Sequence, residues 1–315
     1  MQHDLNGQLI TLFGGGGFIG RYTAQRLLSA GARLRVAQRN PAAAAFLKPL
    51  GNLGQTQFAA VDIREPASVA RAVAGSDAVV NLVGAFADMD AVQHRGAANI
   101  AGAAADAGIT RLVHVSAIGA DVDSPAVYGR SKGLGEAAVL AAVPSATILR
   151  PSTVFGREDQ FINRFAAMIR LAPAMPLVSP RTKFQPVYVG DVAAAVAAAL
   201  ASSGADPAAA GRVFELGGPQ ILSMEELFRW IAAAVGRKPL FVTVPDAVAA
   251  AMARLTGWAP GAPLTWDQWL MLQKDTVVAP GAATLADLGI TPTPLDAVAK
   301  DWLVTYRRHG RFAAS

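Results

Sequence analysis

Two side chains in the middle of the chain, Tyr128 and Lys132, have the types and the spacing of an acid–base pair. Residues four apart share one face of a helix, so we expect both side chains to point the same way. In an enzyme that transfers hydride, the tyrosine of such a pair is the general acid or base. The lysine charge lowers the pKa of the tyrosine and holds a ribose of the cofactor. The alternative interpretation is an ordinary pair on a helix surface.

Glycines near the start of the chain have the spacing that would hold the phosphates of such a cofactor. An apolar run over residues 9–13 ends in Gly14, Gly17 and Gly20 follow at intervals of three residues, and a helical pattern comes next. Glycine permits a positive φ in a tight turn and leaves room for a pyrophosphate near the backbone. The unpaired N–H groups at the helix N-terminus bind phosphate. Strand, glycine turn and helix together predict a dinucleotide-binding site.

Residues that follow the next strands bear on which dinucleotide binds. An NAD site usually carries an acid about 20 residues past the glycines to bind the ribose 2′-hydroxyl, but this chain has Arg39 there. A guanidinium suits a 2′-phosphate, which favours NADP(H) over NAD(H), and the alternative is an exposed loop arginine. Asp62 fits either a contact with the adenine amino group or a cap for a helix that begins near Pro66. Gly84 would let the backbone pass close to the cofactor.

Alternating strands and helices must position these residues. Strands are expected at 9–13, 33–37, 57–61, 78–83, 111–115 and 147–151, with a long helix at about 90–107 that Gly108 closes. This alternation predicts a doubly wound parallel α/β sheet covered by helices on both faces, the Rossmann arrangement. After it we expect a helix at 157–171, a strand at 184–191, a helix at 192–201 and a strand at 212–216.

The last third of the chain changes to a helical pattern. Ser223 and Glu226 predict a capping box for a helix that runs through Val235, and further helices are expected at 245–255, 265–274 and 295–308. The predicted domains are residues 1–157, completed by 184–201 and 212–218, and a smaller, mostly helical lobe of 158–183 and 219–315.

Composition narrows the kinds of site that the chain can hold. Of its 315 residues 52% are hydrophobic and 16% charged, so we expect a sizeable core. The absence of cysteine excludes disulfides and thiolate chemistry. The four histidines, His3, His94, His114 and His309, lack the spacing of metal ligands, so no metal is expected. We recognise no signal peptide and no apolar run of the ~18–20 residues that span a bilayer. These features favour an intracellular soluble protein, or one attached to a membrane surface.

The net charge of +5 comes from 22 arginines and six lysines against 23 acidic residues, with Arg307, Arg308 and Arg311 clustered near the end. A solvated basic surface is the favoured interpretation, and an acidic partner or anionic lipid is the second. No nucleic-acid motif is found, so no nucleic acid is expected as a partner. A set of three tryptophans in the lobe fits either a core or a contact with membrane or partner (Trp258, Trp266, Trp269).

With these motifs in place, the chain resembles an extended or atypical short-chain dehydrogenase/reductase over residues 8–220. The resemblance rests on the three glycines, Asp62, the 81–84 string NLVG, the Tyr128–Lys132 pair and the 150–156 string RPSTVFG. Within that family, the strings FGREDQFIN at 155–163, QPVYV at 185–189 and DLGI at 287–290 resemble the NAD(P)H-binding accessory subunits of respiratory complex I. That resemblance implies a tightly held NADPH outside the electron path, other complex I subunits as partners and a peripheral place near the membrane arm and the quinone region, with lipid contact. It also implies the cytoplasmic face of the inner membrane of a bacterium.

The chain departs from active members of the family after its fifth strand. These enzymes carry a substrate-binding hydroxyl there, and Ser116 is followed here by Ala117 and Ile118. If the hydroxyl position aligns with Ile118, the donor is missing, and if Ser116 reaches, the triad is whole. Asn99 fits either the family's polar relay or a plain helix residue. No catalytic residue is therefore expected, and the vestigial candidates are Tyr128, Lys132, Ser116 and Asn99.

The expected cofactor-binding residues follow from the motifs and the resemblance together. They are Gly14, Gly17, Phe18, Ile19, Gly20, Arg39, Asp62, Ile63, Leu82, Val83, Gly84, Ser116, Tyr128, Lys132, Pro151 and Ser152. The competing hypothesis is a free NADP-dependent reductase, dehydrogenase or epimerase in which Tyr128 is the acid or base and Ser116 the substrate donor. A module that senses the NADP⁺/NADPH ratio is a third.

Overall fold

The structure, a computed structural model, describes residues 5–202, 211–259, 261–308 and 310. His3, His309, Arg311 and most of the connection before Gly211 lie outside the described residues. The chain divides into two compact units. Unit 1 comprises Met1–Pro151, Val189–Leu216 and Ala279–Thr291, and unit 2 comprises Ser152–Tyr188, Gly217–Val278 and Pro292–Ser315.

A seven-stranded parallel sheet forms the centre of unit 1, in the order β11-β6-β5-β4-β1-β2-β3. Its strands are β1 (Leu9–Phe13), β2 (Arg33–Gln38), β3 (Thr56–Ala60), β4 (Ala78–Asn81), β5 (Leu112–Val115), β6 (Thr147–Pro151) and β11 (Val213–Leu216). The register sets Phe13 opposite both Ala37 and Asn81, so the carboxyl ends of the central strands meet at one edge. The predicted doubly wound sheet is confirmed.

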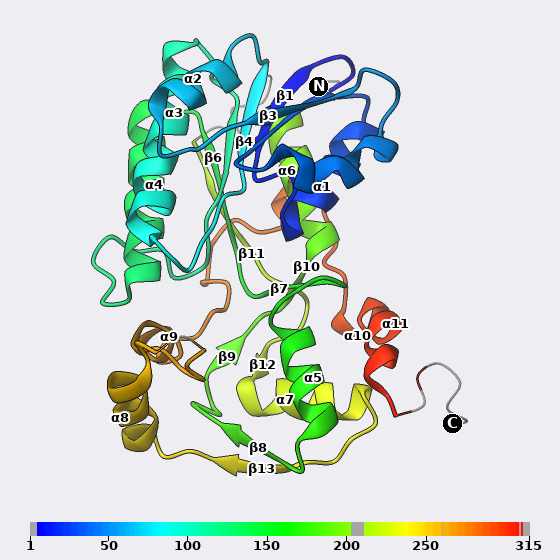
Figure 1. Ribbon diagram of the computed structural model, residues 1–315, viewed down its shortest axis with the longest axis vertical. Coiled ribbons are helices and arrows are strands. Elements are labelled where there is room, and N and C mark those ends of the chain that lie inside the picture. Colours follow the sequence, from blue (N-terminus) through cyan, green and yellow to red (C-terminus); the bar gives the residue numbers. More distant parts are fainter. Residues whose placement is uncertain (1–4, 203–210, 260, 309, 311–315) are drawn as a thin grey trace. The chain divides into compact units, whose positions relative to one another are not determined.

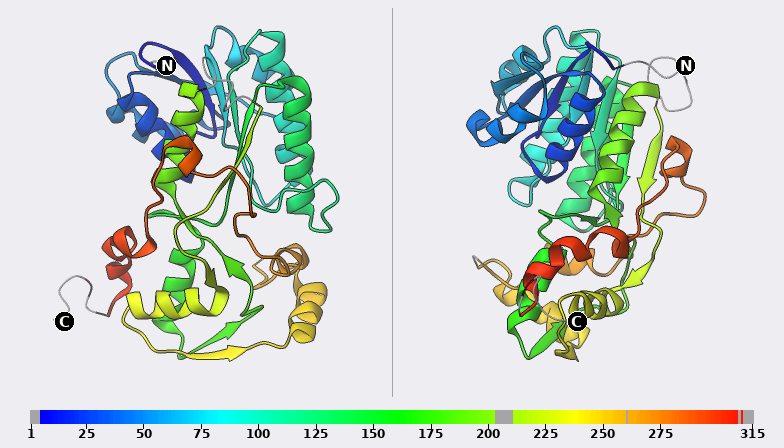
Figure 2. Two further views of the ribbon diagram at one scale, coloured as in Figure 1. Left: turned by 180° about the vertical axis from the view of Figure 1, so that it is seen from behind. Right: turned by 90° about the vertical axis from the view of Figure 1, so that its right-hand side faces the viewer.

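Helices cover both faces of this sheet, because its central strands are apolar on both sides. α1 (Phe18–Ser29) and α6 (Val189–Ser202) lie on one face, and α2 (Pro66–Val73), α3 (Gly96–Asp106) and α4 (Val127–Ala142) on the other (Figure 1). Both views of Figure 2 show the same layers. A 3₁₀ helix at Pro41–Leu50 follows β2. The core between the sheet and α2–α4 is built largely from valine, isoleucine and alanine, with Phe13 at its end.

Local signals explain where several elements begin and end, and where the expectations were wrong. The long helix expected at 90–107 starts with a π-helical turn, Asp90–Arg95, and continues as α3 until Gly108, whose φ is +71°. α5 (Ile162–Leu171) begins five residues later than predicted, because the buried carboxylate of Asp159 accepts the N–H groups of Phe161 and Asn163 at its start. The strand expected at 184–191 is two short strands, and α6 begins within it.

Unit 2 combines short strand pairs with helices. The pairs are β10 (Val187–Tyr188) with β7 (Val154–Phe155), β12 (Leu222–Ser223) with β9 (Lys183–Phe184), and β13 (Leu240–Thr243) with β8 (Ala174–Leu177). The helices are α5, α7 (Met224–Ala234), α8 (Asp246–Thr256), α9 (Trp266–Met271), α10 (Leu295–Val298) and α11 (Lys300–Leu303). The helices of this part were predicted, but its three strand pairs were not.

The ends of the unit 2 helices follow from capping. The capping box of Ser223 and Glu226 is present, with hydrogen bonds in both directions. Thr265 forms a second one with Gln268 and so fixes the start of α9, which ends at Met271 and is shorter than the helix expected at 265–274. The helix expected at 295–308 tightens to 3₁₀ over its last turn (Val304–Tyr306). Throughout the described ranges, no helix is both long and apolar enough to cross a membrane.

Candidate functional site

The glycine turn after β1 has the geometry that a bound pyrophosphate needs. Gly14 has φ +79°, and the N–H of Gly17, the residue just before α1, donates to the Gly14 carbonyl at 3.0 Å. A Cβ at Gly20 would lie 2.2 Å from the same oxygen. Phe18 and Ile19 open the helix, and its first N–H groups face the turn with no side-chain cap. These observations fit a phosphate at the N-terminus of α1.

Gln38, which the sequence interpretation missed, closes one side of this turn. Its Oε1 accepts the N–H of Gly16 at 3.0 Å, and its amide nitrogen donates to Asn40 O. A Cβ at Gly16 would be 2.3 Å from that oxygen, so Gly16 is needed for this contact. Gln38 thus places a neutral amide at the end of β2, where an NAD site carries an acid. Arg39 follows it and is exposed.

Asp62, after β3, is paired with a residue that was not predicted. Its carboxylate accepts hydrogen bonds from the backbone N–H and the guanidinium of Arg64, the latter at 2.6 Å. These bonds lower the pKa of Asp62 to about 2, and the charge of Arg39 acts in the same direction. The capping interpretation is wrong: Glu65, not Asp62, precedes the first residue of α2. Asp62, Arg64 and Arg39 thus gather charge at the ends of β2 and β3.

Ile63 and Asn99 connect that charge cluster to α3. The side-chain amide of Asn99 donates to the carbonyl of Ile63 at 2.8 Å. Ile63 is buried, and a Cβ at Gly96 would lie 2.6 Å from its Cδ1. Asn99 therefore positions the loop after β3, a structural role that differs from the polar relay considered for it.

The end of β4 passes close to the glycine turn. The N–H of Leu82 donates to Phe13 O, and that of Val83 to the Asn81 side chain at 3.0 Å. A Cβ at Gly84 would meet Lys132 Nζ at 3.7 Å and Gln93 Oε1 at 4.0 Å. A methyl group would therefore fit beside this glycine, in ordinary contact with an ammonium and an amide oxygen.

Tyr128 and Lys132 lie in the first turns of α4, at the same edge of the sheet. Lys132 is buried, its Nζ donates to Val115 O at 3.2 Å, and desolvation lowers its pKa to about 8. Burial raises the pKa of Tyr128 to about 12. The lysine was expected to lower the pKa of the tyrosine, whereas the shift found in this structure is upward and comes from burial. Tyr128 therefore stays protonated near neutral pH, whereas the pKa of Lys132 lies close to that range.

Three buried polar atoms in this region have no hydrogen-bond partner among the described residues: Ser116 Oγ, Gln93 Oε1 and His114 Nε2. Gln93, on the π-helical turn, donates to Ser131 Oγ at 3.1 Å, and His114 Nδ1 meets the Asn81 amide at 3.0 Å. Buried polar atoms are normally paired, so such orphans mark places for a water or a ligand group. Gln93 is a further residue that the sequence did not reveal, although π-helical turns are often found at functional sites.

The last expected contacts follow β6. Pro151 ends the strand and its carbonyl accepts the N–H of Ile118, so Ile118 is fixed by its backbone. Ser152 begins unit 2, and its Oγ donates to Thr276 O at 2.6 Å. The residues of unit 1 named above thus lie at the carboxyl ends of β1–β6 or on the segments that follow them, where open α/β sheets bind ligands.

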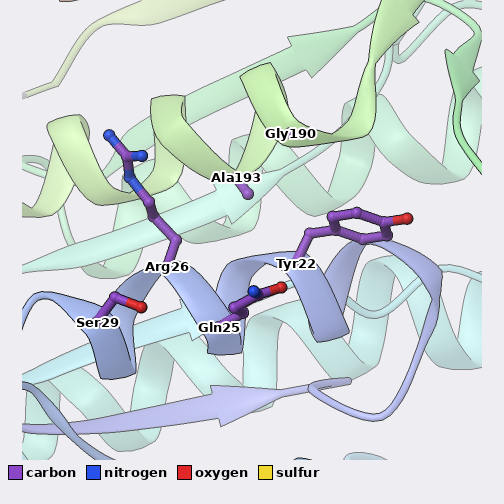
Figure 3. Close-up of a pocket in the computed structure, with 6 residues that line it drawn as sticks. All are labelled: Tyr22, Gln25, Arg26, Ser29, Gly190 and Ala193. Atoms are coloured by element: carbon purple, nitrogen blue, oxygen red, sulfur yellow. The ribbon is translucent and has the colours of Figure 1, made fainter. Parts of the chain in front are cut away.

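Two other observations bear on what the chain can bind. A pocket of about 240 Å³ lies between α1 and α6, lined by Tyr22, Gln25, Arg26, Ser29, Gly190 and Ala193 (Figure 3), and it shares no residue with the expected cofactor site. Within the part of the chain that the structure describes, no group of three or more histidine, aspartate or glutamate side chains is placed to hold a metal ion.

Comparisons with known proteins show the family and the fold to which the chain is similar. Residues 10–217 match the NAD dependent epimerase/dehydratase family. The chain is 35% identical, over 98% of its length and 80% of the other, to the mitochondrial NADH dehydrogenase [ubiquinone] 1 alpha subcomplex subunit 9 of Arabidopsis thaliana. It is also 35% identical to the rat protein of that name, over 93% of this chain and 79% of the other. In fold it matches the NADPH complex of the Escherichia coli quinone oxidoreductase QOR2, with TM-score 0.74 and 19% identity, over 93% of this chain and 99% of that one.

These relatives correct the location expected from the sequence. The bacterial inner membrane was predicted, but both relatives reported above are mitochondrial proteins of eukaryotes. The prediction of a bacterial location is therefore contradicted.

Proposed function

This chain belongs to the NAD dependent epimerase/dehydratase family and, within it, to the family of complex I alpha subcomplex subunit 9. From that premise we propose that it is a non-catalytic, NADPH-binding subunit of respiratory complex I. The observation that carries the proposal is the identity of 35% over 98% of the chain. That match includes unit 2 as well as the glycine turn, and unit 2 lies mostly beyond the residues that match the enzyme family.

The residues of unit 1 support NADPH as the ligand. The glycine turn leaves room for a pyrophosphate, and the N-terminus of α1 offers it N–H groups. At the end of β2 the neutral Gln38 stands where a carboxylate would repel a 2′-phosphate, and Arg39 beside it can bind one. NADPH supplies hydride when it reacts, but in this proposal it serves as a permanent structural ligand.

The electrostatics around Tyr128 support the absence of turnover. A tyrosine with a pKa of about 12 is a weak acid and stays protonated at neutral pH, so it is a poor base as well. Ile118 offers no side-chain hydroxyl after β5, and Ser116 Oγ is buried. Lys132 can still bind a ribose hydroxyl, because binding a hydroxyl requires only a donor.

Charge and exposed apolar side chains support unit 2 as the docking part. Unit 2 has 14 lysines and arginines against nine acidic residues, whereas unit 1 has 14 of each, so the whole excess lies in unit 2. α8 and the residues after it expose Val248, Leu255 at 74% and Trp258 at 82%. Trp266 and Trp269 are instead stacked 4.7 Å apart on the small core beneath α8. Exposed tryptophan and leucine on a unit with an excess of positive charge fit an anionic membrane surface.

Native electrophoresis of respiratory membranes tests the proposal. We expect an antibody against this chain to label the band of intact complex I, and mass spectrometry of the nucleotide extracted from that band to give NADPH. A chain that migrates alone in freshly prepared membranes would contradict the assembly, and extraction of NADH would contradict the choice of nucleotide.

Vesicle binding tests the docking part separately. The purified chain should sediment with vesicles that contain cardiolipin or phosphatidylglycerol and much less with neutral phosphatidylcholine. A double variant, Leu255→Ala with Trp258→Ala, should lose most of that binding. The matched control is Leu53→Ala, which removes a fully exposed leucine of unit 1. Equal binding by the double variant would rule out this surface.

A free NADP-dependent reductase remains the second candidate, and the retained Tyr128–Lys132 pair on α4 favours it. It predicts that NADPH exchanges rapidly and is oxidised by a carbonyl substrate, and that Tyr128→Phe abolishes the oxidation. Bound nucleotide that survives purification in the reduced form would exclude it.

A further inference from the structure

Phe86 is an exposed aromatic residue that contacts the expected active-site tyrosine. It lies on the connection between β4 and the π-helical turn, two residues past Gly84. Its ring is stacked on that of Tyr128, with 5.1 Å between centroids and 15° between planes. Phe86 is nevertheless 72% exposed, so it contributes little to the core. Its main contact is therefore the face of the tyrosine.

The backbone of this connection brings the phenylalanine over the tyrosine. Asp88 adopts φ +49°, the left-handed region that a non-glycine residue seldom occupies, and the chain turns there toward Asp90. Asp90 is held by its pairing with His94 and Arg95, at 2.9 and 3.1 Å. Phe86 thus lies in the middle of the connection, between Gly84 and this turn.

A substrate that exchanges a proton with Tyr128 has to bring an oxygen to the phenol and its reacting carbon beside the ring. A second ring stacked on the phenol takes the space over one face. We propose that Phe86 is a specificity-determining residue of this site: an intramolecular cap that excludes carbonyl substrates from Tyr128. The inference rests on the placement of Tyr128 in the proposed cofactor site. Besides the missing hydroxyl at Ile118, such a cap would further slow any reaction at Tyr128.

The cap should protect Tyr128 from reagents as it does from substrates. Nitration of the full-length chain by tetranitromethane at pH 8, followed by digestion and mass spectrometry, reports on each tyrosine by itself. Tyr22, Tyr188 and Tyr306 serve as internal references. In Phe86→Ala, we expect the nitration rate of Tyr128 to rise about two- to twelve-fold. This factor is the ratio of stacked to unstacked forms that the interaction energy of an aromatic pair gives. Phe86→Trp, which can stack, should keep the protection.

The matched control is Phe46→Ala. Phe46 is a partly exposed phenylalanine of unit 1, packed under the guanidinium of Arg21 at 4.7 Å. Its removal should leave the rate at Tyr128 unchanged. An unchanged rate at Tyr128 in Phe86→Ala would overturn the cap, and so would an equal rise at every tyrosine, because that would show a general loosening of the fold. The measurement needs neither nucleotide nor partner subunits, so its failure is distinct from failure of the complex I assignment.

Discussion

The Nζ of Lys132 donates a hydrogen bond to the carbonyl of Val115 at 3.2 Å, and this bond ties a buried ammonium to the end of β5. The same ammonium lies beside Gly84, and so does Gln93 Oε1 from the π-helical turn, with room between them and this glycine for a methyl-sized group. An ammonium has three donors. The arrangement therefore offers a donor and an unpaired acceptor to a hydroxyl placed between them, which is the binding chemistry that a sugar requires.

Filling that space should weaken nucleotide binding. The methyl group of Gly84→Ala would lie 3.7 Å from Lys132 Nζ and 4.0 Å from Gln93 Oε1, ordinary contacts that leave the fold intact. It would nevertheless occupy the place of a ligand hydroxyl. We expect the Kd for NADPH, measured by titration calorimetry, to rise about tenfold, the value of one lost hydrogen bond. The control is Gly102→Ala on α3, where a Cβ meets nothing within 4 Å. An unchanged Kd would show that no ligand atom enters this space.

The end of β2 should set the choice between NADPH and NADH. Arg39→Ala removes the cation expected to bind the 2′-phosphate, so NADPH affinity should fall about 10- to 100-fold, as for a charge-assisted hydrogen bond. The affinity for NADH, which lacks that phosphate, should change little. Gln38→Glu should act in the same direction, because its carboxylate would repel the phosphate and accept a ribose hydroxyl. The exposed Arg33 on the same strand supplies the control, Arg33→Ala. Equal losses for both nucleotides in Arg39→Ala would contradict a phosphate-specific role.

Sequence reasoning reaches some of these features and not others, for physical reasons. The glycine turn was predictable because single-residue constraints define it: φ +79° at Gly14, and no room for a Cβ at Gly20. The sheet was predictable because each of its inner strands is a short apolar run. Gln93 and Phe86 were not, since their roles depend on contacts with Ser131 and Tyr128, about 40 residues away, that no local pattern encodes.

The predicted ends of the helices contained smaller errors. The start of α5 depends on one buried carboxylate, Asp159, within a run that reads as helix from Arg157 onward. The cofactor assignments themselves remain predictions, because they concern a ligand. The structure contributes the geometry that those predictions need.

The ion pair of Glu136 with Arg150 should be important for stability. The Glu136 carboxylate is buried on α4 and accepts the guanidinium of Arg150 from β6, with Nε at 2.9 Å, while Glu215 on β11 lies 3.8 Å from the same guanidinium. Glu136→Ala leaves the half-buried guanidinium of Arg150 with Glu215, the more distant carboxylate, as its remaining partner. We expect the free energy of unfolding in urea to fall by about 2–4 kcal/mol. Glu225→Ala, which breaks the exposed pair with Arg229 on α7, should cost less than about 0.5 kcal/mol. Similar losses in the two variants would contradict the difference in burial.

His114 should make the fold sensitive to mild acid. It is fully buried on β5, and desolvation, aided by the positive charge of Lys132, lowers its pKa to about 3. The Asn81 amide nitrogen donates to Nδ1, because Asn81 Oδ1 accepts the N–H of Val83, so the neutral ring carries its proton on Nε2. The unfolded chain has a histidine pKa of about 6.5 and binds this proton more readily than the folded chain. The stability that the neutral, buried imidazole contributes to the folded chain is therefore fully present above pH 6.5 and is lost as the pH falls toward 3.

At pH 5 that loss amounts to about 2 kcal/mol relative to pH 7. His114→Gln keeps a polar side chain of similar size and cannot titrate, so its stability should decline less between pH 7 and pH 5 than that of the wild type. Urea unfolding of both proteins at the two pH values measures the difference directly, because all other titrating groups are shared. The partly exposed His94 gives the control variant, His94→Gln, whose stability profile should stay closer to that of the wild type. Parallel pH profiles for His114→Gln and the wild type would show that the buried imidazole takes up its proton without cost.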